Sequence, residues 1–555
     1  MVPEGCQQAG RETSSSLDRL ICLGLPLRRE ELKAKQKSWM PIGGAQIAEC
    51  ALAEAFLRYH PLESICFVPT GAESEGELNE RLAEYPYSSG STVISPAEAL
   101  RYPGRSLIFQ SSPRLFEAAG FRSFWGSPDW PMVGITHSLS GFDGIASAIF
   151  TATPSEHVKS FDRLICTSNA ADRAFEELEA CVHQPQMDND STRDKGGIHK
   201  SVMPLGVDIE RFRPAPSASV RPKLGLASDD VIFLYCGRFS VEFKMDPFPL
   251  LAAFALAFGS QPNVKLILAG DSTGGGHTKI PDIARDLQIA DQVSIVADPS
   301  APVKIGLYQA ADVFVSFSDN LQETFGLTIL EAMSCGLPVL ATDWSGYRDT
   351  VIHEETGLLV PTTWYAADSH TSRLSPFSSE QSVHRMFSQE ISFDVRAAAT
   401  VMRRLALDRE LRNELGRRGR LRAVRHYAWP VIADSYGRLF RELIAEAADD
   451  DRRGAPELAT YPYYSYDHLL VFQHFATHVS GPPPAVAWVT DDRVYSAASN
   501  LLPEAALAAL AITRAPGSVM PTTWLVGVLT AALGESHAAI SVLRLLLKYG
   551  VLVIA

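Results

Sequence analysis

The sequence predicts an α/β protein made of two doubly wound domains and a smaller C-terminal module. Short apolar runs alternate with helix-like segments, which is typical of parallel sheets covered by helices. The alternation occurs twice, and 555 residues are enough for about three to four domains. We therefore expect the following order: a flexible tail over 1–16, a first α/β domain over 17–205, a second over 206–428, a crossover helix over 429–447 and an accessory domain over 448–555.

The first half contains five short apolar runs that are expected to form strands. They cover residues 19–25, 64–68, 106–109, 132–136 and 163–167. An apolar-periodic segment over about 45–58 predicts a helix after the first strand. The stretch 71–84 is polar and lacks periodicity, so it is expected to be a surface loop.

The second half repeats the pattern at more regular spacing. Strands are expected over residues 231–236, 264–269, 293–296, 313–317 and 338–341. Helices are expected over 247–258 and 327–334. An arginine-rich stretch over 397–426 is helix-prone, and its interleaved acidic residues predict a solvated, salt-bridged helix face.

Composition excludes several classes of protein. The formal net charge is −14, so a nucleic acid is not expected as a partner. The eight cysteines form no CxxC pair, which argues against a zinc knuckle and suits a reducing compartment. The N-terminal residues lack the apolar core of a signal peptide, and no run of 18 apolar residues exists to span a membrane. We expect a cytoplasmic protein.

Two glutamates and a helix N-terminus form the most informative pattern. Glu323 precedes the expected helix, and Glu331 lies in its second turn. An open helix N-terminus favours an anionic group such as a diphosphate. Carboxylates suit the hydroxyl groups of a sugar or ribose. Together they could contact different parts of one extended ligand.

The context of these glutamates resembles the GT-B glycosyltransferases, specifically the retaining glycosyltransferase family 4 (glycosyl transferases group 1). The resemblance covers about residues 17–447 and is most specific in the later half. Its motifs are Glu323 to Val339, Gly346-Tyr347-Arg348-Asp349, Thr356 to Pro361, Pro204 to Asp208, Phe212-Arg213-Pro214, Gly237-Arg238 with Lys244, Gly270-Asp271 and Tyr427-Ala428-Trp429.

The resemblance implies roles for the matched residues. Arg238 and Lys244 would hold the donor diphosphate and stabilise its charge as it leaves. Glu331 would bind the ribose hydroxyls, and Glu323 would lie beside the transferred sugar. Further donor contacts would come from Gly237 and from the backbone N–H groups of Phe325, Gly326 and Leu327. The first domain would bind the acceptor, and the second the nucleotide sugar.

The first domain offers fewer candidates. Gly43 and Gly44 open a helix, and glycines allow a phosphate or sugar to approach the backbone closely. His137 follows an expected strand at the edge of the cleft. There it would contact the donor sugar or the reacting groups.

The implied chemistry is sugar transfer to an acceptor hydroxyl with retention of configuration. The leaving phosphate can take the acceptor proton, so the protein needs to supply orientation and charge stabilisation. Asp188-Asn189-Asp190 has the DxD pattern of metal-dependent transferases but lies in a polar loop. We expect neither a metal nor another cofactor besides the donor substrate.

The C-terminal hundred residues lie outside the resemblance. Helices over about 523–533 and 537–549, followed by a strand over 551–554, resemble part of a winged-helix module. From Pro456 onward there are six acidic and four basic residues, which does not suit a DNA-binding module. This module could instead recruit a peptide or protein acceptor, or pack in a homo-oligomer.

Three functions therefore stay open. The first is a hexosyl-type glycosyltransferase that acts on a glycan, a small molecule or a peptide. The second is a binding or regulatory protein that keeps the scaffold without turnover. The third is a different GT-B enzyme, such as a nucleotide-sugar epimerase or a glycan phosphorylase.

Overall fold

The structure is a computed structural model that describes most of the chain. The described residues are 18–27, 44–69, 74–95, 98, 105–124, 129–152, 158–183, 198–216, 220–259, 261–273, 275–364, 375–449, 483–488, 495, 499, 502–515, 517–548 and 551–555. The chain divides into two compact units, residues 1–464 and residues 465–555. Gly43 and the Asp188–Asp190 triplet lie outside the described residues.

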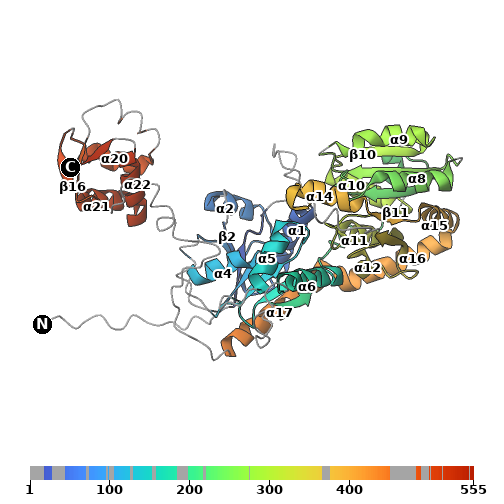
Figure 1. Ribbon diagram of the computed structural model, residues 1–555, viewed down its shortest axis with the longest axis horizontal. Coiled ribbons are helices and arrows are strands. Elements are labelled where there is room, and N and C mark those ends of the chain that lie inside the picture. Colours follow the sequence, from blue (N-terminus) through green and yellow to red (C-terminus); the bar gives the residue numbers. More distant parts are fainter. Residues whose placement is uncertain are drawn as a thin grey trace. The chain divides into compact units, whose positions relative to one another are not determined.

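The first α/β domain, drawn in blue to teal in Figure 1, is built on a parallel seven-stranded sheet with the order β3-β2-β1-β4-β5-β6-β7. Its strands are β1 (Arg19–Leu23), β2 (Ser64–Val68), β3 (Ser91–Val93), β4 (Ser106–Gln110), β5 (Met132–Ile135), β6 (Arg163–Cys166) and β7 (His199–Val202). Its helices are α1 (Gly44–Tyr59), α2 (Glu75–Ala83), α4 (Leu115–Phe124), α5 (Phe142–Ala152) and α6 (Asn169–His183).

The second α/β domain repeats this topology, with the strand order β10-β9-β8-β11-β12-β13-β14. Its strands are β8 (Val231–Cys236), β9 (Val264–Gly270), β10 (Val293–Ala297), β11 (Val313–Ser316), β12 (Val339–Asp343), β13 (Gly357–Trp364) and the antiparallel β14 (Ile391–Phe393). Its helices are α8 (Pro247–Phe258), α9 (Ile280–Asp286), α10 (Ala301–Ala310), α11 (Leu327–Ser334), α12 (Tyr347–Thr350), α14 (Glu380–Ser388), α15 (Val395–Leu407) and α16 (Arg409–Arg422).

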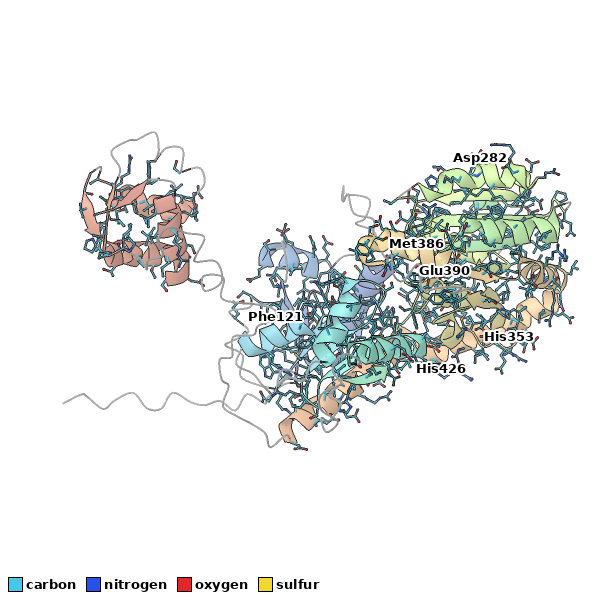
Figure 2. All side chains as sticks on the ribbon, viewed as in Figure 1. Phe121, Asp282, His353, Met386, Glu390 and His426 are labelled. Atoms are coloured by element: carbon cyan, nitrogen blue, oxygen red, sulfur yellow. The ribbon has the colours of Figure 1, made fainter. Side chains whose placement is uncertain are left out.

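Alternate residues of the central strands enter different cores, because successive side chains of a strand point to opposite faces. In β1, Leu20 and Cys22 join one core while Ile21 and Leu23 join another. All four are fully buried, which explains the uninterrupted apolar run in the sequence. Side chains fill the space between the sheets and their helices (Figure 2).

Helix α17 (Trp429–Asp449) returns the chain to the first domain. Its Tyr436 and Phe440 rings pack edge-on against Phe56 of α1 at centroid distances of 5.4 and 6.0 Å. Where the chain crosses back, Val207 donates its backbone N–H to Tyr427, and Trp429 donates its own to Val207. A Cβ atom on Gly206 would lie 2.4 Å from the Trp429 ring, so this junction requires glycine.

One segment differs from the sequence prediction. The stretch 71–84, expected to be a loop, contains helix α2. Ser74 caps this helix: its side chain accepts from the Glu77 backbone, and the Glu77 side chain accepts from the Ser74 backbone. Only Leu78 and Leu82 of this helix are buried, so its apolar periodicity is weak. The capping pattern of Ser74 and Glu77 is the feature of the sequence that indicates a helix here.

The second compact unit has a core of its own. Its three-stranded antiparallel sheet has the order β16-β15-β17. Its elements are β15 (Ala485–Trp488), α20 (Glu504–Thr513), β16 (Val519–Pro521), α21 (Thr522–Leu533), α22 (Ser536–Lys548) and β17 (Leu552–Ile554). The fully buried Leu510, Leu525, Leu529 and Leu546 bring helices α20, α21 and α22 together.

None of the helices in the described part of the chain is both long enough and apolar enough to cross a bilayer.

Candidate functional site

The site residues of the second domain follow the carboxyl ends of its strands. Gly237 and Arg238 come directly after β8, Asp271 follows β9, and the segment from 317 to 326 joins β11 to α11. The carboxyl ends of parallel strands share one edge of the sheet, which is where ligands of such folds bind. The topology therefore brings these residues to one edge.

Glycines allow the segments at this edge of the sheet to approach each other closely. A Cβ atom on Gly270 would lie 1.7 Å from the carbonyl oxygen of Gly237, so the loops after β8 and β9 are in backbone contact. A Cβ atom on Gly237 would lie 2.6 Å from the Tyr235 hydroxyl and 3.2 Å from Cε of Lys244. Glycine at 237 therefore leaves room for the lysine side chain.

Lys244 forms an ion pair with Glu323, although 79 residues separate them. Both side chains are mostly buried, with 15% and 10% of their surfaces exposed. Burial lowers the pKa of Lys244, but Glu323, Tyr347 and Tyr235 together outweigh it and the net shift is upward. The ammonium group therefore stays charged at neutral pH.

Tyr347 also contacts the carboxylate of this ion pair. Its hydroxyl lies 3.3 Å from Oε2 of Glu323 and 2.8 Å from the hydroxyl of Ser316. Burial, with the Glu323 charge adding to it, raises the pKa of Tyr347 to about 12. The phenol is thus neutral and can donate a hydrogen bond to the carboxylate.

The turn that carries Lys244 is held by the segment after β11. The Ser318 hydroxyl donates to the carbonyl of Lys244 at 3.0 Å, and the Asn320 side-chain amide donates to the carbonyl of Glu242 at 2.7 Å. These bonds fix the loop after β8 against the loop that carries Glu323. The predicted site residues Lys244 and Glu323 therefore lie on two loops that are hydrogen-bonded to each other.

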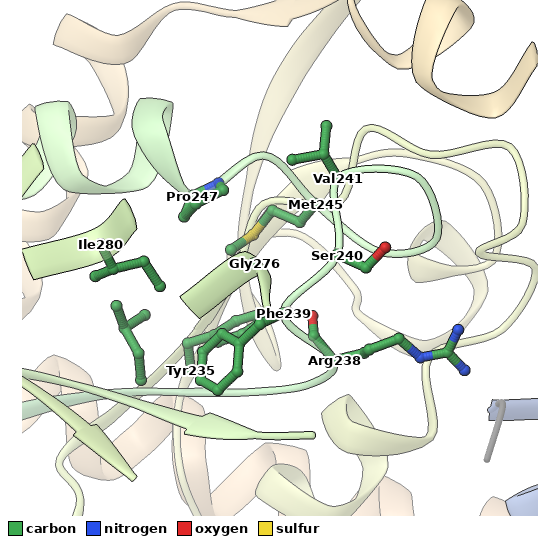
Figure 3. A pocket seen from close by; sticks show the side chains of 10 residues that line it. Tyr235, Arg238, Phe239, Ser240, Val241, Met245, Pro247, Gly276 and Ile280 are labelled. Atoms are coloured by element: carbon green, nitrogen blue, oxygen red, sulfur yellow. Dashed lines mark hydrogen bonds between the residues drawn. The ribbon is translucent and has the colours of Figure 1, made fainter. Parts of the chain in front are cut away.

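Arg238 lines a small cavity of about 20 Å³ with Tyr235, Met245 and Ile280. Figure 3 shows its guanidinium group extending away from these apolar side chains. The guanidinium carbon lies 5.3 Å from the centre of the Phe243 ring, a cation–π distance. Burial lowers the pKa of Arg238, with Asp271 opposing the shift.

Glu331 lies on α11, as predicted, and α10 fixes its carboxylate. Lys304 donates to Oε1 at 2.7 Å, and the Tyr308 hydroxyl donates to Oε2 at 2.7 Å. Sequence reasoning missed both partners. Lys304 and Tyr308 stand four residues apart on α10 and so share a face, but nothing in the local sequence indicates which helix that face meets.

Glu331 also borders the larger cavity, which measures about 280 Å³. The cavity lies between α1, the segment that joins the domains and the start of α11. Its lining residues are Ile47, Cys50, Ala51, Glu54, Ala55, Arg58, Tyr59, Gly206, Val207, Asp208, Arg211, Phe212, Leu327, Glu331 and Trp429. It has room for a ribose-sized group and is lined by residues of both domains.

The helix that carries Glu331 begins at Leu327, after Gly326 in a left-handed conformation with φ 97°. A Cβ atom on Gly326 would lie 2.6 Å from the Tyr347 ring. The buried Phe325 ring lies 6.3 Å from that of Tyr427. Glycine is therefore required here both for the backbone angle and for the packing.

His137 follows β5 in the first domain. Burial lowers the pKa of His137 to about 4, and the backbone of Ser111 opposes this shift only in part. Its carbonyl accepts a hydrogen bond from the Thr324 hydroxyl at 2.8 Å. His137 is thus placed against the loop that carries Glu323. Gly44, the other described candidate from this domain, is the first residue of α1.

Within the described part of the chain, no group of three His, Cys, Asp or Glu residues is arranged to hold a metal ion.

Comparison with known proteins identifies a related family. Residues 217–391 match the family described as "Glycosyl transferases group 1". The chain is 29% identical over 380 residues to a D-inositol 3-phosphate glycosyltransferase of Saccharomonospora viridis, covering 67% of this chain and 77% of that protein. A relative of the same name from Thermobispora bispora is 30% identical over 49% of this chain and 63% of its own length.

Solved structures resemble the first compact unit in fold. A glycosyltransferase from Rickettsia africae has a TM-score of 0.52 at 13% identity, covering 79% of this chain and 100% of its own. Anabaena HepE in complex with UDP has a TM-score of 0.51 at 17% identity, covering 78% and 100%. The two facing doubly wound domains are the GT-B arrangement.

Proposed function

Because this chain is a glycosyltransferase with a group 1 domain over residues 217–391, we propose that it transfers a sugar from a nucleotide-diphosphate sugar to an acceptor hydroxyl. The observation that carries the proposal is the ion pair between Lys244 and Glu323. It joins a cation suited to a diphosphate and a carboxylate suited to sugar hydroxyls, so the bond between sugar and phosphate would lie beside this pair.

The donor occupies an extended site on the second domain. Arg238, Lys244 and the N-terminus of α11 bind the diphosphate, and they are local positive groups in a chain of net charge −14. Glu331 binds the ribose hydroxyls at the 280 Å³ cavity. Its carboxylate oxygens have further acceptor capacity beyond their bonds to Lys304 and Tyr308.

The reaction retains the anomeric configuration. The acceptor oxygen forms a bond to the anomeric carbon on the face from which the phosphate leaves. The bond between the anomeric carbon and the phosphate oxygen breaks, and the acceptor proton passes to the leaving phosphate. Lys244 and Arg238 stabilise the negative charge on that phosphate. His137 stays neutral at physiological pH and can therefore accept or donate a hydrogen bond to the sugar without adding charge.

A donor panel tests the proposal. The purified chain is incubated with UDP-, GDP- and ADP-sugars, and released nucleoside diphosphate is measured. D-inositol 3-phosphate is one of the acceptors, because relatives carry its name. Turnover of at least one donor supports enzymatic transfer, whereas binding without release from any donor favours a regulatory scaffold.

Three further measurements examine the finer claims. NMR of the product gives the anomeric configuration, and inversion would refute the retaining mechanism. Activity should be unchanged in EDTA; a loss restored by manganese would establish a metal requirement. Glu331→Ala should weaken donor binding at least tenfold, and an unchanged affinity would remove Glu331 from the site.

The second compact unit is proposed to recruit the acceptor. The donor residues all lie in the first unit, so deletion of residues 465–555 should leave donor hydrolysis unchanged. If the unit binds a peptide or protein acceptor, the deletion raises the KM for that acceptor. Unchanged KM values for every acceptor would contradict this role.

A further inference from the structure

Helix α6 of the first domain is capped by residues from both domains. Within its own domain, the Ser168 hydroxyl accepts from the backbone N–H of Ala171 at 3.0 Å. Asp349 of the second domain accepts from the backbone N–H of Asn169 at 2.6 Å and from its side-chain amide at 3.1 Å. A carboxylate at a helix N-terminus satisfies an open N–H group and interacts favourably with the helix dipole.

Asp349 is also tied to the junction of the two domains. Its backbone carbonyl accepts from the Tyr427 hydroxyl at 2.9 Å and from Nη2 of Arg422 at 2.8 Å. The backbone carbonyl of Tyr427 in turn accepts from Val207, in the segment that joins the domains. The carboxylate therefore contacts the first domain while its backbone is anchored at the junction.

The short helix that carries Asp349 packs under the donor loop. A Cβ atom on Gly346 would lie 2.1 Å from the carbonyl oxygen of Thr324, so the two backbones touch. Tyr347, two residues before Asp349, hydrogen-bonds to Glu323. A displacement of Asp349 would therefore move the Glu323 carboxylate, through the backbone contact of Gly346 with Thr324 and the hydrogen bond of Tyr347 to Glu323.

We propose that Asp349 is a positioning residue that holds the two α/β domains at the angle needed for sugar transfer. This inference rests on the proposed glycosyltransferase activity. Asp349 is not needed to bind the nucleotide, because Arg238, Lys244 and Glu331 lie on other elements. Its loss should slow the transfer step while the donor still binds.

Four variants test the contact. Asp349→Ala removes the carboxylate but keeps the backbone bonds to Tyr427 and Arg422. Asn169→Asp places a second carboxylate against the first. The double variant Asn169→Asp with Asp349→Asn exchanges the two side chains. The backbone N–H of residue 169 can still donate to the side-chain oxygen of residue 349, and the bond between the two side chains can form with donor and acceptor reversed. Arg348→Ala is the control: its side chain is 57% exposed and pairs with Asp343 in its own domain.

We expect Asp349→Ala and Asn169→Asp to lower kcat about tenfold. Binding of UDP, GDP or ADP, measured by calorimetry, should stay within twofold of the wild type. The exchanged pair should recover most of the lost rate, which side chains acting independently would not do. Hydrogen exchange of the peptide over 167–173 should be faster in Asp349→Ala and unchanged in Arg348→Ala.

The outcomes separate this inference from the proposed function. An active wild type with equal rates for Asp349→Ala and Arg348→Ala would overturn the positioning role alone. A tenfold loss of nucleotide binding in Asp349→Ala would also overturn it, since the residue would then belong to the donor site. If Asp349→Ala fails to fold, Asn169→Asp and the exchanged pair decide the question. A wild type that is inactive on every donor defeats the proposed function itself.

Discussion

The hydroxyl of Thr324 donates a hydrogen bond of 2.8 Å to the backbone carbonyl of His137 across the two α/β domains. Thr324 follows the carboxylate residue Glu323, and His137 follows strand β5 of the opposite sheet. The bond thus joins the loop that carries Glu323 to the loop that faces it from the first domain. The acceptor is the backbone carbonyl of His137, so this hydrogen bond does not depend on the imidazole side chain.

Replacing Thr324 by Val removes this bond at nearly constant volume. One hydrogen bond contributes about 1 kcal/mol, so kcat/KM should fall about fivefold, and Thr324→Ser should retain most of the activity because it keeps the hydroxyl. Steady-state kinetics of the three proteins measure the effect. Equal rates for Val and Ser at this position would show that the contact does not matter for turnover.

Tyr308→Phe and Lys304→Met should each raise the donor KM about fivefold while kcat stays within twofold. Each variant removes one of the two bonds that orient Glu331, whose contact with the donor is present before and during the reaction. Lys265→Met is the matched control, because Lys265 lies near the amino end of β9, away from the site edge, and donates to the backbone carbonyl of Asp291 at 3.1 Å. A kcat effect without a KM effect would contradict the predicted ribose contact.

Gly270→Ala should destabilise the first unit by about 3 kcal/mol or more. The new methyl group would lie 1.7 Å from the Gly237 carbonyl oxygen, so one of two buried backbone segments must move. Gly275→Ala is the comparison, because its φ is also positive but no atom lies within 4 Å. Gly275→Ala should lower the free energy of unfolding by only about 1 kcal/mol. Urea unfolding followed by circular dichroism gives both values.

His137 should make the fold less stable at mildly acidic pH. Burial holds its pKa at about 4, below the ordinary value near 6.5, so the unfolded chain binds a proton that the folded chain rejects. Between pH 7 and pH 5 this lowers the free energy of unfolding by about 2 kcal/mol. Burial raises the pKa of Glu49 and Asp319 to about 8, which acts in the opposite sense.

The contribution of His137 is therefore measured as a difference between two proteins. Urea unfolding of the wild type and of His137→Gln at pH 7 and pH 5 isolates it, since Glu49 and Asp319 are present in both. The wild type should lose about 2 kcal/mol more than the variant over this range. An equal loss in both proteins would mean that the imidazole takes up its proton in the folded state.

The central strands could be predicted from sequence because the parallel sheets are buried on both faces. Strands 64–68 and 231–236 have the predicted bounds, as does the helix over 247–258. The two edge strands of the first sheet were missed: β3 has three residues, and β7 has no fully buried side chain, so neither has a continuous apolar run. The helical periodicity of α2 was too weak to outweigh its polar composition.

The chemistry-bearing residues of the site could be proposed from their motifs, but their partners could not. Lys244, Glu323 and Glu331 stand in recognisable patterns, whereas Lys304, Tyr308 and Thr324 matter through contacts with distant segments. Asp349 illustrates the same limit. Its motif is visible in the sequence, but its bond to Asn169 depends on how two separately folded sheets meet.

Helix α17 has a consequence for the order in which the chain acquires structure during synthesis. The ring of Phe56 in α1 is enclosed by Tyr436 and Phe440, about 380 residues later in the chain. The second domain is continuous in sequence, so it can form its core first, whereas the earlier-synthesised domain must wait for the returning helix. A ribosome-bound fragment that ends before α17 should therefore leave an apolar face of the first domain accessible to chaperones.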